Sequence, residues 1–382
     1  MAARPFSLAQ EFPVPLPPEH NEPRAATRGV ARAPFGMTRE QVPVEVYTLT
    51  NANGVEMRAI TYGAIITSLK VPDRSGRFDD IVLGFETVDG YLEATRYFGA
   101  LIGRYGNRIA RGQFTLEGKT FTLPTNNGPN HLHGGVKGFD QVLWNAMPAD
   151  GAEGVSLTLT RRSPDGEEGY PGNLQVSVRY LLTDTNELAI DYRATTDKPT
   201  PVNLTQHSYF NLAADDRDVL GHQLMLKASR YTPVDDTLIP TGELARVEGT
   251  PFDFRTPRAI GDRIDVDHVQ LKNGKGYDHN WVIDRTGPAL ERAASVVELT
   301  SGRIMEVATT EPGIQFYSGN FLDGTATGKG GRVSKHRTGF CLETQHYPDS
   351  PNHPSFPSTI LHPGQTYASK TVFTFGVTRR TL

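Results

Sequence analysis

Short stretches in which apolar and polar residues alternate recur along most of the chain. Residues 174–180, 188–192 and 371–375 are clear examples, and each is bounded by residues that favour turns. Alternation with a period of two is typical of β-strands that bury one face, whereas the 3.6-residue period of amphipathic helices is scarce here. The pattern therefore predicts a chain built mainly of strands from about Val44 onward.

Turn-forming residues separate these predicted strands and indicate how they are connected. The chain contains 38 Gly and 27 Pro, and its clearest turn signals are Asn53-Gly54, 73–76, 184–186 and Asn273-Gly274. Short strands joined by tight turns, without a strand–helix–strand rhythm, favour antiparallel sheets over an α/β fold. No internal repeat or linker divides the chain after residue 43. We therefore predict one all-β domain, a large antiparallel β-sandwich, over residues 37–382.

Residues 1–36 differ from the rest of the chain in composition. Proline recurs there without periodicity, and the apolar core of a signal peptide is not visible. We interpret this segment as an extended Pro-rich N-terminal arm. Three explanations stay open: a cloning remnant, a tail left after a signal was removed, or a segment that wraps the domain. The cytoplasm is the favoured location, and the second explanation leaves the periplasm or the exterior open.

Charge and cysteine content narrow the classes of partner. The 39 basic and 43 acidic residues give a net charge of −4 without long runs of either sign, which argues against nucleic acid or an anionic membrane as partner. No stretch approaches the roughly 20 apolar residues that a membrane helix needs. Cys341 is the only cysteine, which excludes an intrachain disulfide and a Cys-rich metal site, and we expect a buried thiol. These features favour a small uncharged molecule as the partner.

Three polar strand signatures lie far apart in the sequence. In Asn203-Leu-Thr-Gln-His207-Ser-Tyr209, alternation places the asparagine, threonine, histidine and tyrosine on one face; in Phe340-Cys-Leu-Glu343-Thr-Gln345, it separates the cysteine, glutamate and glutamine from the two apolar residues. The third signature is Gly276-Tyr-Asp278-His-Asn280. A His, an Asp and a Glu delivered by separate segments suit acid/base chemistry on a neutral sugar ring. We expect His207 and Glu343 to line one cleft.

Two further segments carry candidate binding residues. Asn107 and Arg108 adjoin at the end of an apolar run, and the guanidinium either holds sugar hydroxyls or braces a loop. His131 and His133 form an H-x-H pair, which on a strand directs both imidazoles to one face, so a metal site needs to be considered. No carboxylate-rich segment nearby completes a metal site. We therefore favour a hydrogen bond from one of these histidines to substrate.

Seven segments, in order from about Val44 to the C-terminus, together resemble the galactose mutarotase (aldose 1-epimerase) family. They are Gly103-Arg-Tyr-Gly-Asn-Arg-Ile109, Leu132-His-Gly-Gly-Val-Lys-Gly-Phe-Asp140 with Trp144, Asn203-Leu-Thr-Gln-His-Ser-Tyr-Phe-Asn-Leu212, Tyr231-Thr-Pro-Val-Asp235 with Ile239-Pro-Thr-Gly-Glu243, Tyr277-Asp-His-Asn280, Gly313-Ile-Gln-Phe-Tyr-Ser-Gly-Asn-Phe-Leu322 and Leu342-Glu-Thr-Gln345. The resemblance implies a galactose mutarotase-like supersandwich that interconverts the α and β anomers of free aldohexoses such as galactose and glucose.

The family's site residues carry over where residue types match. The resemblance implies that Glu343 is the general base for the anomeric hydroxyl and that His207 is the general acid for the ring oxygen. The implied substrate-binding residues are Asn107, Arg108, His133, Asp278 and Gln315. It also implies an isomerase with neither cofactor nor metal, acting on a small aldose. The preferred aldose stays open, as does the choice between a monomer and a homodimer.

Three other classes compete with this interpretation. A carbohydrate-binding module would use the same sandwich but has no need for both Glu343 and His207. An epimerase of phosphorylated hexoses would need a cationic patch, for which Arg108 alone is thin support. A glycoside hydrolase or lyase would usually need a second carboxylate, for which Asp278 is the candidate.

Overall fold

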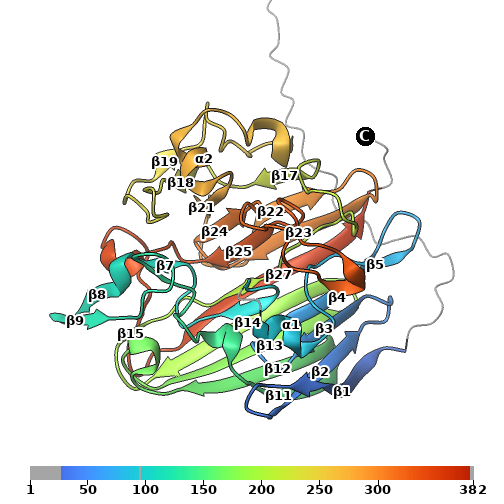
Figure 1. Ribbon diagram of the computed structural model, residues 1–382, viewed down its shortest axis with the longest axis horizontal. Coiled ribbons are helices and arrows are strands. Elements are labelled where there is room, and N and C mark those ends of the chain that lie inside the picture. Colours follow the sequence, from blue (N-terminus) through green and yellow to red (C-terminus); the bar gives the residue numbers. More distant parts are fainter. Residues whose placement is uncertain (1–26, 94–95, 379–382) are drawn as a thin grey trace, which may run out of the picture.

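The computed structural model describes residues 27–93 and 96–378 of the 382-residue chain (Figure 1). Within these ranges the only α-helices are the short α1 (Val88–Glu93) and α2 (Val269–Gly274), and almost all other regular structure is β-strand. The strands pair antiparallel throughout the named sheets. The all-β prediction is confirmed. No described helix is long and apolar enough to cross a membrane.

A nine-stranded antiparallel sheet forms the largest layer, and in Figure 1 it extends from the bottom of the molecule into its upper half. Its strands, in spatial order, are β11 (Asn145–Gly151), β12 (Gly154–Ser163), β13 (Leu174–Thr183), β14 (Glu187–Thr196), β27 (Tyr367–Val377), β23 (Arg303–Thr309), β22 (Glu291–Val297), β17 (Gln223–Leu226) and β20 (Arg258–Ala259). The three alternating stretches singled out in the sequence lie within β13, β14 and β27. The prediction that these three stretches are strands is therefore confirmed.

A five-stranded sheet packs against one end of this layer. It is a simple meander of β1 (Gly29–Met37), β2 (Pro43–Thr50), β3 (Glu56–Ile60), β4 (Ile66–Pro72) and β5 (Phe78–Asp80). Leu49 and Met57 from this sheet share one hydrophobic cluster with Leu157 and Val178 from the nine-stranded sheet. Burial of this shared apolar surface is what holds the two layers together.

The N-terminal boundary differs from the prediction. Strand β1 pairs with β2 from Gly29 to Met37, so residues 29–36 belong to the sheet and the predicted boundary at residue 36 falls inside a strand. The alternation of this segment is masked by Gly36 and Pro34, where the register shifts. The earlier part of the predicted arm, residues 1–26, lies outside the described residues.

A second five-stranded sheet supplies most of the polar signatures. Its spatial order is β19 (Ala245–Arg246), β18 (Arg230–Thr232), β21 (Asp278–Val282), β24 (Gly313–Tyr317) and β25 (Cys341–Gln345). Trp281, Phe316 and Leu342 point to its apolar face and join the main core cluster. The opposite face carries the polar residues because side chains alternate along each strand.

Within the described residues, four short strand pairs lie outside the three larger sheets, and the first two carry the remaining signatures to the pocket. They are β6 (Ala100–Ile102) with β16 (Thr205–His207), β7 (Arg108–Ile109) with β10 (His131–Leu132), β8 (Gln113–Leu116) with β9 (Lys119–Thr122), and β15 (Thr200–Pro201) with β26 (Ile360–Leu361). The predicted turn at Asn273-Gly274 is instead the end of α2, where Lys275 takes a left-handed conformation.

Candidate active site

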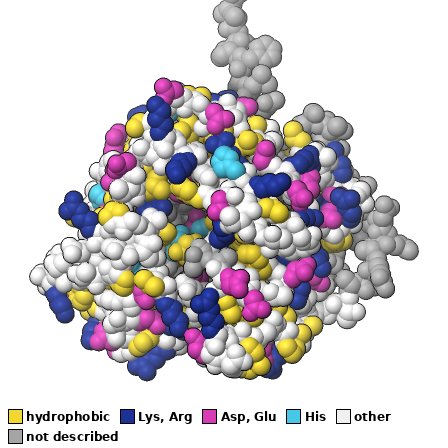
Figure 2. Space-filling model, in the orientation of Figure 1, with side chains coloured by type: hydrophobic (Ala, Val, Ile, Leu, Met, Phe, Trp, Pro, Cys, Tyr) yellow, Lys and Arg dark blue, Asp and Glu magenta, His cyan; other side chains and the backbone are white. Residues whose placement is uncertain are grey.

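A pocket of about 550 Å³ opens over the polar face of the second five-stranded sheet. Figure 2 shows the hollow near the middle of one face, with histidine side chains at its bottom. Six of the seven residues predicted from the sequence line it: Asn107, Arg108, His133, His207, Asp278 and Glu343. Segments that are far apart in the sequence therefore converge on one concave site, the usual form of a small-molecule site.

His207 and Glu343 face each other at the bottom of this pocket. His207 Nε2 lies 3.6 Å from Glu343 Oε1, and both side chains are at least 95% buried, with 5% and 3% exposed. His207 ends β16, whereas Glu343 is central in β25. The expectation that both side chains line one cleft is confirmed.

Aromatic side chains hold the His207 ring in place. Tyr209 stacks on it with ring centroids 5.1 Å apart, and Tyr97 stacks at 5.7 Å. The buried Cys341 Sγ lies 3.5 Å from His207 Nδ1, and burial raises the pKa of this thiol well above its ordinary value, so it stays protonated. Sequence reasoning missed Tyr97 as a site residue because its surroundings carry no motif; Tyr209 shares the period-two pattern of the His207 segment.

His133 is oriented by a reciprocal pair of backbone contacts with Asn107. The Asn107 N–H donates to His133 Nδ1 at 3.1 Å, and the His133 N–H donates to the Asn107 carbonyl at 3.0 Å. The next residue, Gly134, has φ +88°, and a Cβ there would lie 1.9 Å from the Gly103 carbonyl oxygen. Only glycine permits this close approach, which brings the two loops together.

The two histidines of the H-x-H pair do not share a site. His131 Nδ1 lies 2.7 Å from the Pro124 carbonyl, and its Nε2 lies 2.7 Å from the Tyr170 hydroxyl, so this imidazole supports the loops around the pocket. His133 has φ +51°, which breaks the strand and turns its side chain into the pocket. The hypothesis that one of the pair faces the substrate space is consistent with this placement.

Arg108, Asp278 and Gln315 form a connected polar group beside Glu343. Gln315 Nε2 donates to Asp278 Oδ1 at 2.8 Å, and Arg108 Nη2 lies 4.0 Å from Asp278 Oδ2. Arg108 Nε also donates to Asn127 Oδ1 at 3.0 Å, so this residue braces a loop and also faces the pocket. Gln315 is the predicted site residue that does not line the pocket. It lies beneath it, between Asp278 and Glu343.

Burial drives the charged groups of the site toward their neutral forms. Burial, helped by the Asp278 carboxylate, raises the pKa of Glu343 well above its usual value, and Arg108 only partly opposes this. Burial lowers the pKa of His207 to about 4. His133 is shifted in the same direction, by burial and then by the nearby His207 and Arg108. The opposed shifts of Glu343 and His207 are typical of acid/base sites.

Three potential metal ligands also meet here, and they differ from the His131–His133 pair considered in the sequence. The ligand atoms of His133, His207 and Glu343 lie within 4.8 Å of one another. However, His133 Nδ1 accepts the Asn107 N–H, so in the neutral imidazole the proton sits on Nε2, the nitrogen that a metal would need. Metal-binding histidines instead donate from their second nitrogen. The donor set fits hydrogen bonding to a hydroxyl better than metal ligation.

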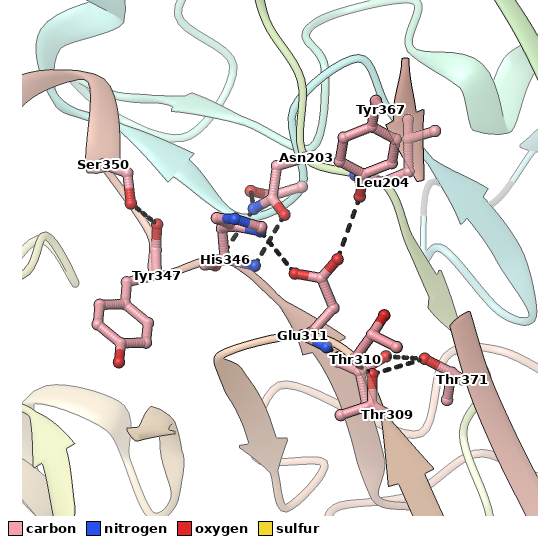
Figure 3. Close-up of polar contacts among 12 residues, drawn as sticks. Asn203, Leu204, Thr309, Thr310, Glu311, His346, Tyr347, Ser350, Tyr367 and Thr371 are labelled. Atoms are coloured by element: carbon pink, nitrogen blue, oxygen red, sulfur yellow. Dashed lines mark hydrogen bonds and ion pairs between the residues drawn. The ribbon is translucent and has the colours of Figure 1, made fainter. Parts of the chain in front are cut away.

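Behind the sheet, a second polar cluster fixes the strand that carries Glu343. His346 Nδ1 lies 2.6 Å from Glu311 Oε2, and Tyr367 donates to Glu311 Oε1 at 3.3 Å (Figure 3). The His346 N–H donates to Asn203 Oδ1 at 3.0 Å. Asn203 therefore turns to this rear cluster, although alternation placed it on the same strand face as His207. The contact ties the end of β25 to the segment that leads into His207.

The protein is a large antiparallel β-sandwich with a polar pocket that holds a buried carboxylate–imidazole pair, an arrangement that suits acid/base chemistry on a small polar substrate. Residues 45–374 match the family model described as Aldose 1-epimerase, and the chain belongs to this family.

Relatives and a solved structure extend this assignment. The chain is 49% identical over 351 residues to galactose mutarotase of Bos taurus, covering 91% of this chain and 99% of that protein. It is 41% identical over 335 residues to aldose 1-epimerase of Escherichia coli K12, covering 87% and 95%. The crystal structure of galactose 1-epimerase from Lactobacillus acidophilus superposes with a TM-score of 0.81 at 28% identity, covering 91% of this chain and 99% of that one. The chain is thus an isomerase that interconverts the anomers of aldoses.

Proposed function

We propose that free aldohexoses such as galactose and glucose are the substrates, and that Glu343 and His207 open and reclose the sugar ring. Glu343 takes the proton from the anomeric hydroxyl while His207 gives a proton to the ring oxygen, and the bond between C1 and that oxygen breaks. Rotation about C1–C2 in the open-chain aldehyde exposes the other face of the carbonyl. The ring recloses with the two roles reversed, so no cofactor is consumed.

The observation that carries this proposal is the 3.6 Å separation of His207 Nε2 and Glu343 Oε1. A pair this close can serve the two oxygens of one anomeric centre. The remaining hydroxyls need directional donors and acceptors, because substrate and product are neutral and differ at one centre. Asn107, Arg108 and His133 offer these groups from the pocket wall, and Asp278, held by Gln315, offers them from the sheet.

The protonation of the pair follows from the opposed pKa shifts. Between a His207 pKa of about 4 and the raised pKa of Glu343, the pair holds one proton, and burial favours its place on the carboxyl. The reactive arrangement has the same total charge, with the proton on His207. The apparent pKa values of the rate profile therefore belong to the pair.

Polarimetry on freshly dissolved α-anomers of galactose, glucose, xylose and arabinose tests the proposal. We expect the wild-type protein to accelerate mutarotation and to rank the four sugars. The Glu343→Gln variant, which keeps the side-chain shape and removes the base, serves as the matched control. Equal acceleration by wild type and variant would contradict the mechanism, and no acceleration of either hexose would contradict the substrate assignment.

A further inference from the structure

Six buried polar atoms, on Glu343 and on three other side chains of its sheet, have no hydrogen-bond partner within the described ranges. They are Glu343 Oε2, Gln315 Oε1 and both side-chain amide atoms of Asn280 and of Gln345. Asn280 is 1% exposed and Gln345 is 0% exposed. Buried polar groups in folded proteins are nearly always hydrogen-bonded, so a concentration of unpartnered ones beside the base needs an explanation.

The strand register places these atoms on one face of the sheet. Asn280, Gln315 and Glu343 are direct cross-strand partners on β21, β24 and β25. Gln345 lies two residues beyond Glu343, so it points to the same side, and its partner across the ladder is Gly313. The polar side chains therefore form a continuous row that extends from the pocket into the interior.

Gly313 leaves space between the two amides. A Cβ at this position would lie 2.4 Å from Asn280 Oδ1 and 3.0 Å from the Tyr347 ring. The Asn280 side chain thus leans over Gly313, toward the position that Gln345 faces from the other strand. The missing side chain lets both amides approach the same space behind Glu343.

The chemistry of the unpartnered set indicates what occupies this space. It contains two amide NH₂ groups, which donate, together with carbonyl and carboxylate oxygens, which accept. A cation would satisfy the oxygens and leave the NH₂ groups without partners. Water satisfies both kinds, and buried waters typically bind about three otherwise unpaired polar groups.

We propose that Asn280 and Gln345 are positioning residues for the base: with buried water, their amides hold Glu343 Oε2 and leave Oε1 free to face His207 and the anomeric hydroxyl. The inference rests on the proposed role of Glu343. Hydrogen bonds to a carboxylate favour its charged form, so this arrangement opposes the effect of burial. The arrangement also gives a role to Asn280 and Gln345. These are the last residues of the signatures Tyr277-Asp-His-Asn280 and Leu342-Glu-Thr-Gln345, and the two-residue mechanism assigns them none.

The test compares Gln345→Met and Asn280→Leu with Thr344→Val. The first two keep the approximate shape and remove the hydrogen-bonding groups, whereas Thr344→Val removes a buried hydroxyl from the opposite face of the same strand. For both amide variants we expect kcat to fall about 10-fold or more, as for a displaced reacting group, with KM nearly unchanged. The alkaline limb of the kcat/KM profile should move to higher pH, because the carboxylate of Glu343 loses stabilising donors. Thr344→Val should lower thermal stability and leave both limbs in place.

Wild-type kcat and unshifted limbs in both amide variants would overturn the inference, as would losses that track thermal stability in the same way as for Thr344→Val. A high-resolution crystal structure decides the matter if the variants do not fold. A water bound to Glu343 Oε2 and to either amide supports the inference, and a dry space or a cation there overturns it. Glu343→Gln separates the two proposals: if it is inactive while Gln345→Met is unaffected, only the positioning role fails.

Discussion

Two buried polar clusters lie on opposite faces of the region around β24 and β25, and they differ in how completely their atoms are paired. The rear cluster, with Glu311, His346 and Tyr367, satisfies its carboxylate from two sides. The pocket cluster leaves Glu343 Oε2 and the amides of Gln345 without partners in the described chain. A cluster that only stabilises the fold gains from complete pairing within the protein, whereas a site tolerates the cost of burying polar groups that protein atoms leave unpaired.

The same contrast appears in the pKa values. Burial alone would raise the pKa of Glu311, but the ion pair with His346 lowers it below its usual value. Burial likewise opposes protonation of His346, yet Glu311 raises its pKa. At the pocket, burial instead favours the neutral forms, because it lowers the pKa of His207 to about 4 and raises the pKa of Glu343 well above its usual value. Two carboxylate–imidazole pairs in one protein are thus poised differently, one as an ion pair and the other for proton exchange.

The largest expected effect is on activity, at Glu343. Glu343→Gln should lower the rate at least about 10²-fold, the low end for loss of a general base, and it should keep the fold because the amide is nearly isosteric. Polarimetry with α-galactose and thermal melting measure the two quantities. Near wild-type mutarotation in the folded variant would remove Glu343 from the mechanism.

A large change in the pH profile is expected at His207. We expect wild-type kcat/KM to be bell-shaped, because activity needs one proton on the pair. With ordinary pKa values, the acid limb would report the carboxylate and the alkaline limb would report the imidazolium. The opposed pKa shifts of the buried pair change this assignment, because the acid limb then reports uptake of a second proton by the pair and the alkaline limb reports loss of its last proton.

In His207→Asn most of the rate and the alkaline limb should disappear. The acid limb of the residual rate should move up to the raised pKa of Glu343. His133→Asn is the control, since it should weaken substrate binding and keep a bell. An unchanged alkaline limb in His207→Asn would mean that another group is the acid.

At the rear cluster the expected effect is on stability. Glu311→Gln should lower the free energy of unfolding by about 2 kcal/mol, because it removes the charged partner of the partly buried His346 imidazolium. The pH dependence has a defined sign. The pKa of His346 is raised in the folded protein, so its stabilisation is complete below the pKa of the unfolded state and is lost as pH rises through the folded pKa. The pKa of Glu311 is lowered, so its stabilisation is complete above the pKa of the unfolded state and is lost as pH falls through the folded pKa.

The difference in stability between wild type and Glu311→Gln should therefore be greatest between about pH 4.3 and 6.5, the ordinary pKa values of the two groups. Denaturant unfolding at several pH values measures it, and the limbs of the kcat/KM profile should stay where they are. A shift of those limbs larger than the change in Gln345→Met would mean that the two clusters are not separate in function.

The smallest expected effect concerns metal. Dialysis against a strong chelator should leave the rate unchanged, because the proton on His133 Nε2 occupies the position that a metal needs. Activity that is lost on dialysis and restored by zinc or manganese would show that the imidazole takes the other tautomer and that His133, His207 and Glu343 bind the ion.

The sequence by itself determined the class of fold and the faces of the strands, because both depend on local periodicity. One example is the segment 340–345, where alternation separated two apolar residues from three others. The structure has the same separation, with Phe340 and Leu342 in the core and Cys341, Glu343 and Gln345 on the other face. The signatures also marked six residues that line the pocket. Local pattern could not show that these residues converge, because the strands that carry them pair across long stretches of chain.

Only the tertiary structure decided which polar residues share a site and what state they are in. His131 and His133 are two residues apart, yet a left-handed backbone at His133 separates their surroundings. Tyr97 reaches His207 across the fold without any sequence signal. Glu311 and Glu343 are the same residue type, and their opposite pKa shifts depend on partners that distant segments supply. Within a regular strand, local pattern indicates which face a side chain takes, but its partners and its desolvation arise only when the sheets pack together.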